Sequence, residues 1–352
     1  MIKRKLGKTD LYINPLGFGG IPIQRISKEE AINLIKTAVD KGINFFDSAR
    51  SYTCSEEYLG LGLIGLRDKV FLATKSMSRT YEEMKNDINA SLEKLKTDYI
   101  DLYQFHNVSK KEDFEKIISS DGAYKALLEA KEKGIIKHIG ITSHSYDFLE
   151  YILDSEYNKL FETIQFPYNF IENKSAKLFE KANELNIGTI AMKPFGGGYI
   201  DKKDVAVKYL LNDSNLSVLI PGMGSIEELN FNLAASENIK LSSDDEDYIS
   251  RTIREAEGTF CHRCGYCLPC TKGIDIPGVF TLENYYDRYG LQDWALKRYK
   301  NMKIKADACI NCKKCISKCP YGLDIPNILK RIHNKFEVEW WKLKREDLLE
   351  KF

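Results

Sequence analysis

Short apolar, β-branched or aromatic runs recur along the first 240 residues of the chain, about 25–35 residues apart. The eight runs that predict strands are residues 13–20, 43–47, 70–75, 99–106, 138–142, 163–166, 187–193 and 218–221. Between these runs, apolar positions return every three or four residues, which is the spacing of one face of an α-helix. Strands that alternate with helices are typical of parallel βα units.

Polar residues mark helix boundaries in the intervening segments. Ser27 and Glu30 fit a capping box at the start of the first helix, and Gly42 fits the position after its C-terminal cap. The same spacing predicts three further helix starts. These pairs are Thr80 with Glu83, Ser225 with Glu228, and Ser243 with Glu246.

Eight strands, each followed by a helix, predict an α/β fold with a closed (β/α)8 TIM barrel. An open, doubly wound sheet is the alternative. A nucleotide-binding sheet of that kind carries GxGxxG after its first strand, and the segment Gly17-Phe18-Gly19-Gly20 lacks the third glycine. Residues 3–16 resemble a hairpin that precedes the first barrel strand. We therefore expect a barrel over residues 1–240, a connecting helix over 241–257 and a mostly helical, cysteine-rich domain over 258–352.

The overall charge is nearly balanced, with 52 Lys and Arg against 51 Asp and Glu among 352 residues. Hydrophobic residues make up 43% of the chain, which excludes a fibrous or disordered protein. A net charge of +1 gives no reason to expect nucleic acid or a membrane surface as a partner. No apolar run approaches the ~20 residues of a membrane span, and the N-terminal segment lacks the apolar core of a secretory signal.

The nine cysteines are unevenly distributed. Cys54 stands alone, and the other eight lie between Cys261 and Cys319. Clustered thiols in a chain without an export signal indicate metal ligands in a reducing compartment, so we expect a cytoplasmic protein. Cys54 follows a predicted strand and is interpreted as an ordinary loop residue, with a reactive or metal-binding thiol as the alternative.

Four polar residues stand at the ends of consecutive predicted strands, where barrel enzymes carry their chemistry. Asp47, Lys75 and His106 end three strands, and Tyr52 follows the first of them. An ammonium beside a phenol favours the phenolate and lowers the pKa of the phenol, and a carboxylate keeps the ammonium in place. Histidine can orient a substrate oxygen or assist proton transfer. Such a set can protonate a carbonyl oxygen while a cofactor supplies hydride.

The segments GINFFDSARSYTCSEEYLG, FLATK and DLYQFHN, in this order, resemble the aldo-keto reductase family over residues 1 to about 240. The resemblance implies a barrel that binds NAD(P)H without a Rossmann fold. It also implies the tetrad of Asp47, Tyr52, Lys75 and His106, with Tyr52 as general acid. The expected reaction is the reversible reduction of an aldehyde or ketone.

Further positions match the cofactor site of that family. Ser143 and His144 stand where the family usually has Ser-Asn, and Gln165 matches the glutamine that holds the nicotinamide amide. Met192 takes the place of an aromatic residue, and a thioether can still cover a ring. The residues Gly196-Gly197-Gly198 would let the backbone approach a pyrophosphate. The remaining expected contacts are Gly20, Lys193, Pro194, Phe195, Gly222, Gly224, Ser225, Glu228 and Asn232, the last of these with the adenine.

The resemblance also bears on the choice between NADH and NADPH. Gly222 and Glu228 stand where NADPH-dependent members often carry Lys and Arg. Because a carboxylate repels a 2′-phosphate and suits ribose hydroxyls, Glu228 favours NADH. The alternative is that Glu228 serves only the capping box with Ser225.

The cysteines of the C-terminal region form two groups. The first group is Cys261, Cys264, Cys267 and Cys270, and the second is Cys309, Cys312, Cys315 and Cys319, followed by Pro320. The second group matches the bacterial ferredoxin pattern for a [4Fe–4S] cluster, whose fourth cysteine binds the other cluster. By that pattern, Cys319 ligates the cluster held by Cys261, Cys264 and Cys267, and Cys270 ligates the cluster held by Cys309, Cys312 and Cys315. The first group departs from the pattern, with two rather than three residues before Cys270 and Thr271 in place of proline, so the assignment of Cys270 stays open.

An internal repeat supports a module with two clusters, because residues 270–277 echo residues 319–326. Zinc is the alternative, although four cysteines in each group exceed what a zinc ribbon needs. The module resembles ferredoxins, and the whole chain resembles an iron-sulfur-fused branch of the aldo-keto reductases.

The chemistry expected of the two halves does not match directly. Hydride transfer moves two electrons at once, whereas a [4Fe–4S] cluster transfers one electron at a time. No flavin motif is visible in the sequence. The first hypothesis is therefore a carbonyl reductase with a small-molecule substrate. Its clusters would be structural or regulatory, or would be coupled to the reaction by a partner or an unseen flavin. The second is an electron-transfer protein whose barrel is a nucleotide-sensing or docking module.

Overall fold

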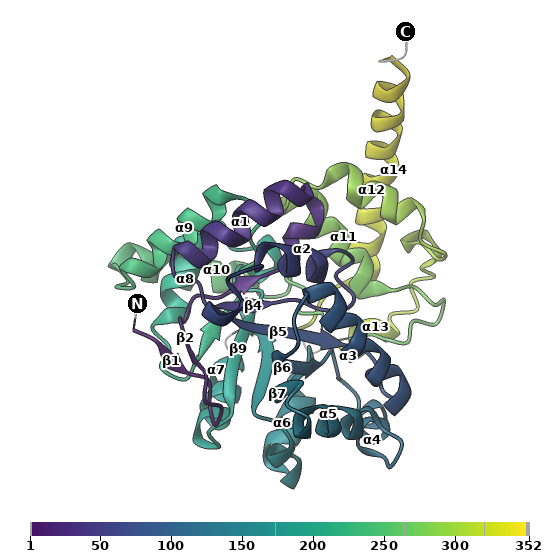
Figure 1. The fold of residues 1–352 in the computed structure, drawn as a ribbon. Coiled ribbons are helices and arrows are strands. Elements are labelled where there is room, and N and C mark those ends of the chain that lie inside the picture. The colour runs from purple at the N-terminus through teal and green to yellow at the C-terminus, as the bar shows by residue number, and fades with distance from the viewer. Residues whose placement is uncertain (1, 173, 264, 320, 350–352) are drawn as a thin grey trace. The chain divides into compact units, whose positions relative to one another are not determined.

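The computed structural model describes residues 2–172, 174–263, 265–319 and 321–349. Two compact units divide the chain (Figure 1). The first unit comprises residues 1–196 and 202–246, and the second comprises residues 197–201 and 247–352. The short segment 197–201 thus belongs to the second unit although it interrupts the sequence of the first.

A hairpin opens the first unit, as the sequence predicts. Strands β1 (Arg4–Lys5) and β2 (Tyr12–Ile13) pair antiparallel, with Arg4 opposite Ile13. The hairpin buries Leu6, Leu11 and Ile13 in an apolar cluster that they share with residues of the parallel strands. This burial attaches the hairpin to the barrel.

Eight parallel strands follow and pair in chain order. They are β3 (Phe18–Gly19), β4 (Phe45–Asp47), β5 (Phe71–Ser76), β6 (Ile100–Phe105), β7 (Ile136–Thr142), β8 (Thr163–Pro167), β9 (Gly188–Met192) and β10 (Val218–Leu219). Each strand lies within or overlaps one of the eight predicted runs. The strand positions predicted from the apolar runs are therefore confirmed.

The first and last strands close the sheet. The Gly17 amide donates to Leu219 O at 2.8 Å, and the Gly19 amide donates to Pro221 O at 2.9 Å. A Cβ on Gly19 would lie 2.8 Å from Ile220 O, so the close approach of the strands requires glycine there. The closed (β/α)8 barrel is confirmed, and the glycines of residues 17–20 serve its closure.

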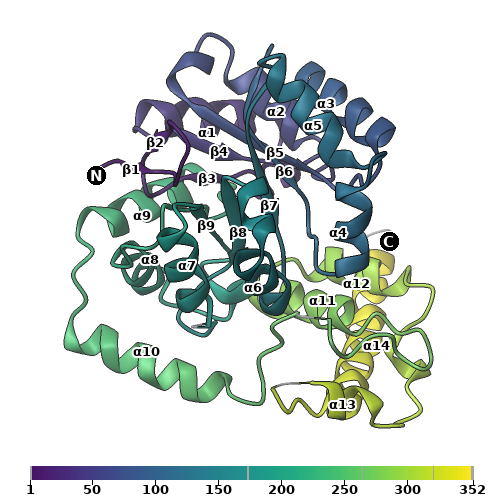
Figure 2. The ribbon, with the colours of Figure 1, turned by 90° about the horizontal axis from the view of Figure 1, so that it is seen from below.

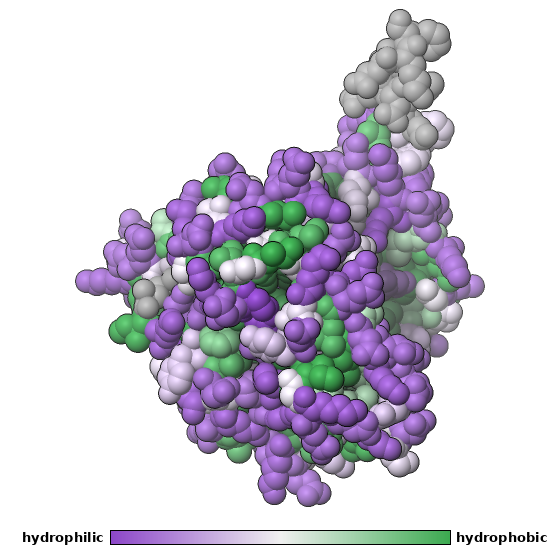
Figure 3. Space-filling model, viewed as in Figure 1, coloured by the Kyte–Doolittle hydropathy of each residue, from purple (hydrophilic) through white to green (hydrophobic). Residues whose placement is uncertain are grey.

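Helices surround the strands of the barrel (Figure 2). They are α1 (Lys28–Asp40), α2 (Ser55–Gly62), α3 (Tyr81–Leu95), α4 (Lys111–Ile118), α5 (Ala123–Glu132), α6 (Tyr146–Asp154), α7 (Lys174–Glu184), α8 (Lys203–Leu211) and α9 (Ile226–Glu237), with short 3₁₀ turns η1 (Pro22–Arg25), η2 (Arg67–Lys69) and η3 (Glu156–Leu160). The apolar sides of these helices pack on the strands. On the surface of the molecule that is visible in Figure 3, hydrophilic residues predominate.

The predicted helix caps are confirmed at α1 and corrected elsewhere. Ser27 and Glu30 form the expected reciprocal box, with the Ser27 amide 2.9 Å from the Glu30 carboxylate. Thr80 precedes α3 but makes no capping hydrogen bond there among the described residues. The amide of the first helical residue, Tyr81, donates to Asp121 O at 3.0 Å.

The last two boxes also differ from the prediction. Ser225 accepts the Glu228 amide as expected, but the Glu228 carboxylate accepts the Gly224 amide at 2.8 Å. At the next helix, α10 (Ser243–Ala256), the box is displaced by one residue to Ser242 and Asp245, which exchange hydrogen bonds. The prediction was wrong here because two adjacent serines fit the same spacing.

Alternation along the strands decides which side chains enter the barrel. On β4, Phe45 lies in the inner apolar cluster and Phe46 in the outer cluster between strands and helices. On β5, Leu72 is outer and Ala73 is inner. Because successive side chains point to opposite faces, Asp47 and Lys75 also point inward.

The second unit is mostly helical and has a core of its own. The chain enters it within α10 and continues through α11 (Ile276–Arg288), α12 (Gln292–Lys300), α13 (Lys314–Lys318) and α14 (Ile325–Leu349), with 3₁₀ turns η4 (Gly196–Gly198) and η5 (Ala306–Ala308). Val279, Tyr299 and Phe336 are fully buried in its apolar cluster. No helix of the described residues is long and apolar enough to cross a bilayer.

Candidate active site

Three neighbouring strands bring polar side chains together inside the barrel. Asp47 is the last residue of β4, Lys75 lies near the end of β5, and Gln104 pairs with Lys75 from β6. They are only 2%, 1% and 0% exposed, respectively. Charged groups so deeply buried need partners, and each of these finds one in the others.

Lys75 and Asp47 form a buried ion pair. The Lys75 ammonium donates to Asp47 Oδ1 and, at 2.7 Å, to Ser48 O. Gln104 Nε2 donates to the other carboxylate oxygen of Asp47 at 3.1 Å. Burial alone would lower the pKa of Lys75, but the charges of Asp47 and Tyr52 outweigh it and the pKa is raised. Lys75 is therefore cationic at neutral pH.

Tyr52 contacts the ammonium from the loop that follows β4. Its ring centroid lies 5.0 Å from Lys75 Nζ, and a hydrogen bond between the two side chains contributes to the raised pKa of Lys75. The Tyr52 amide donates to Ala49 O at 3.0 Å, which fixes the loop. The phenol thus stands beside a permanent positive charge.

His106 follows β6 and meets Tyr52 edge-on, with ring centroids 5.9 Å apart. Its amide donates to Ser76 O at 2.8 Å, and Ser51 Oγ lies 3.5 Å from Nδ1. Burial, together with the charges of Lys75 and Arg79, lowers the pKa of His106 to about 3. The imidazole is therefore neutral at pH 7, with one N–H donor and one acceptor.

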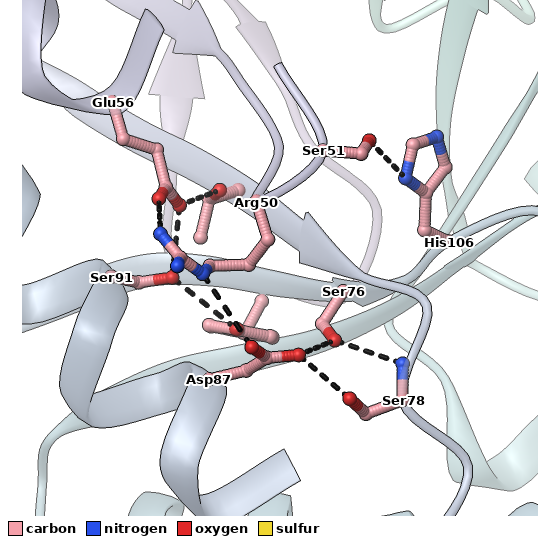
Figure 4. A network of polar contacts seen from close by, with 10 residues as sticks. Arg50, Ser51, Glu56, Ser76, Ser78, Asp87, Ser91 and His106 are labelled. Carbon is pink, nitrogen blue, oxygen red and sulfur yellow. Dashed lines mark hydrogen bonds and ion pairs between the residues drawn. The ribbon is translucent and has the colours of Figure 1, made fainter. Parts of the chain in front are cut away.

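A polar network beneath this loop was not predicted from the sequence (Figure 4). Arg50 pairs with the Glu56 carboxylate of α2, and its Nε lies 3.6 Å from Asp87 Oδ1 of α3. Glu56 also accepts hydrogen bonds from Thr74 at 2.7 Å and from Ser91 at 2.8 Å. The Arg50 amide donates to Lys75 O at 2.9 Å, so the network fastens the Tyr52 loop to β5.

Asp87 extends the network toward His106. It accepts hydrogen bonds from Ser76 and, at 2.7 Å, from Ser78 (Figure 4). Ser76 in turn holds the His106 amide through its carbonyl. One sequence signal could have revealed Glu56: it precedes the buried Leu59 and Leu63 by three and seven residues, so it lies on the apolar face of α2.

The residues expected around the nicotinamide lie on β7 and β8 or just after them. Gln165 pairs with Thr142 in register, is 1% exposed, and its Oε1 has no hydrogen-bond partner among the described residues. Ser143 Oγ lies 3.1 Å from Ser109 Oγ and accepts the Ser145 amide at 3.0 Å. His144 Nδ1 lies 3.3 Å from the ammonium of Lys193.

The residues expected around the adenosine lie on the turn from β10 into α9 and on α9 itself. Asn232 is 3% exposed, and its Oδ1 has no partner among the described residues. The carboxylate of Glu228 holds the Gly224 amide, and Ser225 caps α9. A Cβ on Gly222 would lie 2.8 Å from the Pro22 ring, so that glycine is required by packing.

The remaining expected contacts follow β3 and β9. A Cβ on Gly20 would lie 2.9 Å from Asp47 O, which places this glycine against the end of β4. Half-buried Met192 packs on the inner apolar cluster, and Lys193 O accepts the Gly196 amide at 3.0 Å. Pro194 and Phe195 complete the turn, with Phe195 packed on the outer cluster of the barrel. Gly197 and Gly198 belong to the second unit, where a Cβ on Gly197 would lie 3.1 Å from Arg263.

The cysteine region forms a pocket within the second unit. The pocket is lined by Cys267, Cys270, Cys309, Cys312 and Cys315, among others. Burial and the neighbouring Cys309, Cys312 and Cys270 thiols raise the pKa of Cys315.

The other predicted ligands are placed less completely. Cys261 and Cys319 pack against the same apolar cluster, and Cys264 lies outside the described residues. Within the described ranges no three His, Cys, Asp or Glu side chains already stand in a metal-binding arrangement. The lone Cys54 lies 3.9 Å from Gln24 O in the loop before α2.

Comparison with known families gives two matches. The family model described as Aldo/keto reductase family matches residues 15–205, more than half of the chain. The model described as 4Fe-4S dicluster domain matches residues 260–324. Together they cover most of the barrel and the cysteine region.

Individual relatives agree with the first match. The uncharacterized oxidoreductase YqkF of Bacillus subtilis (strain 168) is 28% identical over 218 residues, covering 58% of this chain and 68% of that protein. L-galactose dehydrogenase of Arabidopsis thaliana is 25% identical over 295 residues, covering 70% of this chain and 92% of that protein. The solved aldo-keto reductase AKR11C1 from Bacillus halodurans shares the fold, with a TM-score of 0.63 at 23% identity over 72% of this chain and 96% of that one.

Proposed function

The chain belongs to the aldo/keto reductase family and carries a 4Fe-4S domain after its barrel, and from this premise we propose that it reduces an aldehyde or ketone, reversibly, with NAD(P)H. The observation that carries the proposal is the phenol of Tyr52, which is hydrogen-bonded to the buried ammonium of Lys75. A phenol in that setting is a stronger acid than one in water.

The residues present suit a nicotinamide dinucleotide. Gln165 Oε1 and Asn232 Oδ1 are buried acceptors without partners among the described residues, which is costly unless a ligand donates to them. A nicotinamide amide and an adenine amino group are donors of the required kind. When bound, the dinucleotide supplies the hydride that no side chain can supply.

Each residue of the tetrad has a separate task in the proposed reaction. Tyr52 Oη donates its proton to the carbonyl oxygen as hydride adds to the carbonyl carbon, so an alcohol forms. The Lys75 ammonium stabilises the phenolate that remains. Asp47 holds Lys75 in place through its ion pair. The neutral imidazole of His106 orients the substrate oxygen with a hydrogen bond, since a pKa of about 3 makes it a poor proton donor at neutral pH.

We further propose a preference for NADH. The first turn of α9 presents a carboxylate, Glu228, which accepts a hydrogen bond from the Gly224 amide. A carboxylate repels the 2′-phosphate of NADPH and accepts hydrogen bonds from the ribose hydroxyls of NADH. The proposal places Glu228 near that ribose.

The experiment that tests the proposed function compares Tyr52→Phe with Tyr58→Phe, a matched control that removes a phenol hydroxyl from α2. Oxidation of NADH and of NADPH is followed with a panel of carbonyls that includes aldoses, since one relative is named for L-galactose. Tyr52→Phe should lower kcat about a hundredfold to ten-thousandfold, the usual contribution of a general acid, with unchanged cofactor affinity. Equal turnover by the two variants would contradict the assignment.

For the second unit we propose two [4Fe–4S] clusters. Cys309, Cys312 and Cys315 with Cys270 would hold one cluster, which the shared pocket supports. Cys261, Cys264 and Cys267 with Cys319 would hold the other, following the ferredoxin pattern. Such clusters exchange single electrons, so we also propose a partner that delivers or accepts them.

Iron and acid-labile sulfide, measured on anaerobically purified protein, test the clusters. We expect about eight of each per chain. Cys309→Ser should lose about half of the iron, while the control Cys54→Ser should keep all of it. Zinc in place of iron would contradict the assignment.

A further inference from the structure

The second unit carries a concentrated positive charge that the near-neutral total conceals. Between Lys297 and Lys318 the sequence has eight lysine and arginine residues against one acidic residue, Asp307. Part of this charge is used internally, since Lys300 binds the Glu337 carboxylate at 2.6 Å and Arg298 lies over the Trp294 ring. The rest is available on the surface.

Three lysines without carboxylate partners stand at the cysteine pocket. Lys272, Lys313 and Lys314 are exposed and line it, and none forms an ion pair with a carboxylate of the described residues. They come from two turns that each carry pocket cysteines, Cys270 and Cys312. Cys312 itself is exposed. Like charges gathered without counter-charges repel one another, so the arrangement gains from an anionic partner.

Apolar side chains lie among these lysines. Ile310 is 57% exposed and lines the pocket next to Cys309. Ile304 is 40% exposed, and its Cδ1 lies 2.9 Å from where a Cβ on Gly273 would stand, beside Lys272. We call the surface of Lys272, Ile304, Ile310, Cys312, Lys313 and Lys314 the lysine face.

We propose that the lysine face is the docking surface for a small acidic protein that carries single electrons. The inference rests on the proposed function, since it takes the cysteine pocket to hold a cluster. Apolar side chains inside a charged rim are typical of protein–protein interfaces, and electron-carrier complexes are small and steered by charge. A carrier bound here would cover the exposed Cys312 and so lie next to the cluster.

Charge and shape favour a protein over other polyanions. A nucleic acid is bound through many phosphate contacts along a basic stripe, often with aromatic rings that stack on bases. An anionic membrane attracts basic residues that lie beside a large apolar face. The lysine face instead joins three lysines to two isoleucines around a thiol pocket.

The test uses the anaerobically purified full chain and, as probe, a purified acidic [2Fe–2S] ferredoxin. The variant is the double charge reversal Lys272→Glu with Lys313→Glu, and the matched control is Lys36→Glu, an exposed lysine of α1. Lys314 is left unchanged because its amide hydrogen-bonds to the Cys312 thiol. Iron content is measured for every preparation, and binding is followed by titration calorimetry over a series of salt concentrations.

We expect the double variant to bind the ferredoxin at least about tenfold more weakly with its iron intact, because like charges then face each other. The control should bind as wild type does, and salt should weaken wild-type binding. Equal binding by the double variant, no binding by wild type, or tighter binding of an RNA oligonucleotide or of phosphatidylserine vesicles would overturn the docking surface. Wild-type protein without iron would instead refute the clusters themselves, and the docking inference with them.

Discussion

In the candidate active site Lys75 is buried and His106 is half-buried, and their neighbours give them opposite charge states. Lys75 has a carboxylate partner in Asp47, so its pKa is raised and it stays protonated. His106 is close to two cations, Lys75 and Arg79, and its pKa falls to about 3. One group therefore holds a positive charge beside the phenol of Tyr52, and the other acts as a neutral hydrogen-bond donor. The division of tasks proposed for Lys75 and His106 follows from these neighbours.

The depressed pKa of His106 predicts a dependence of stability on pH. An unfolded histidine takes up a proton below about pH 6.5, whereas folded His106 does so only near pH 3. The unfolded state thus binds more protons in this window, and stability falls as the pH is lowered from 6.5 toward 3, by at most about 1.4 kcal/mol per pH unit for one group.

His106→Asn should remove that contribution, so the melting temperature of the variant should decline less between pH 6.5 and pH 4 than that of wild type. The carbonyl reductase activity of wild type should likewise show no titration near pH 6.5. A variant whose melting temperature follows the wild-type curve over this range would show that His106 is not held neutral.

The four residues of the proposed tetrad could be selected from the sequence because they interrupt an apolar pattern. Asp47, Lys75 and His106 each place a polar group at the end of a hydrophobic run, and that exception is visible without a structure. Gln104 was not recognised, since a neutral amide inside a strand is unremarkable until its contact with Asp47 is seen. Hydrogen bonds between residues that are far apart in the sequence cannot be predicted from the local spacing of residues.

The loop between β4 and α2 carries Tyr52, the proposed general acid, and is held by contacts with three elements. Arg50 of the loop binds Glu56 of α2, approaches Asp87 of α3, and donates its amide to β5 (Figure 4). Glu56 is only 2% exposed and accepts two further hydrogen bonds. Because Glu56 is buried and only 26% of the Arg50 side chain is exposed, removing one charge leaves the other poorly compensated.

Glu56→Gln should therefore destabilise the barrel by about 3–5 kcal/mol, the usual penalty for breaking a buried ion pair, and lower kcat by loosening the Tyr52 loop. The adjacent Glu57→Gln is the matched control, since Glu57 forms only surface ion pairs with Lys28 and Lys94 and should change stability by less than about 1 kcal/mol. Unfolding of both variants is measured in urea. Equal losses of unfolding free energy in the two variants would show that the Arg50–Glu56 network does not stabilise the barrel more than a surface ion pair does.

Elements were easier to predict than their ends. The strands followed from apolar runs, but the glycines of residues 17–20, judged against a nucleotide-binding motif, turned out to close the barrel. Thr80 lacks the predicted capping hydrogen bond among the described residues, and the box at α10 is displaced by one serine. Local spacing cannot distinguish between adjacent candidates when tertiary contacts decide the outcome.

The molecule combines two units with separate apolar cores. The barrel core is formed by strands and helices of residues 1–246, and the core of the second unit includes buried Cys315 among the side chains of α11, α12 and α14. Cysteines that ligate a metal cluster tie their chain segments together only while the metal is bound, so metal binding contributes to folding stability. The second unit should therefore depend on iron for its stability, and the barrel should not.

Removal of iron by a chelator tests this dependence. Amide hydrogen exchange of α11 and α13 should rise by at least about tenfold, because the open pocket no longer ties their segments together, while β4 to β8 should exchange as before. The barrel serves as the internal control. Unchanged exchange in the second unit would show that its fold does not need the metal.

The most direct test of the account is a crystal structure of the protein with bound NAD⁺. The account predicts that the reactive ring carbon of the nicotinamide lies at the mouth of the barrel beside Tyr52 Oη, with the amide of the same ring hydrogen-bonded to Gln165. A dinucleotide bound elsewhere, or with that carbon far from the phenol, would contradict it.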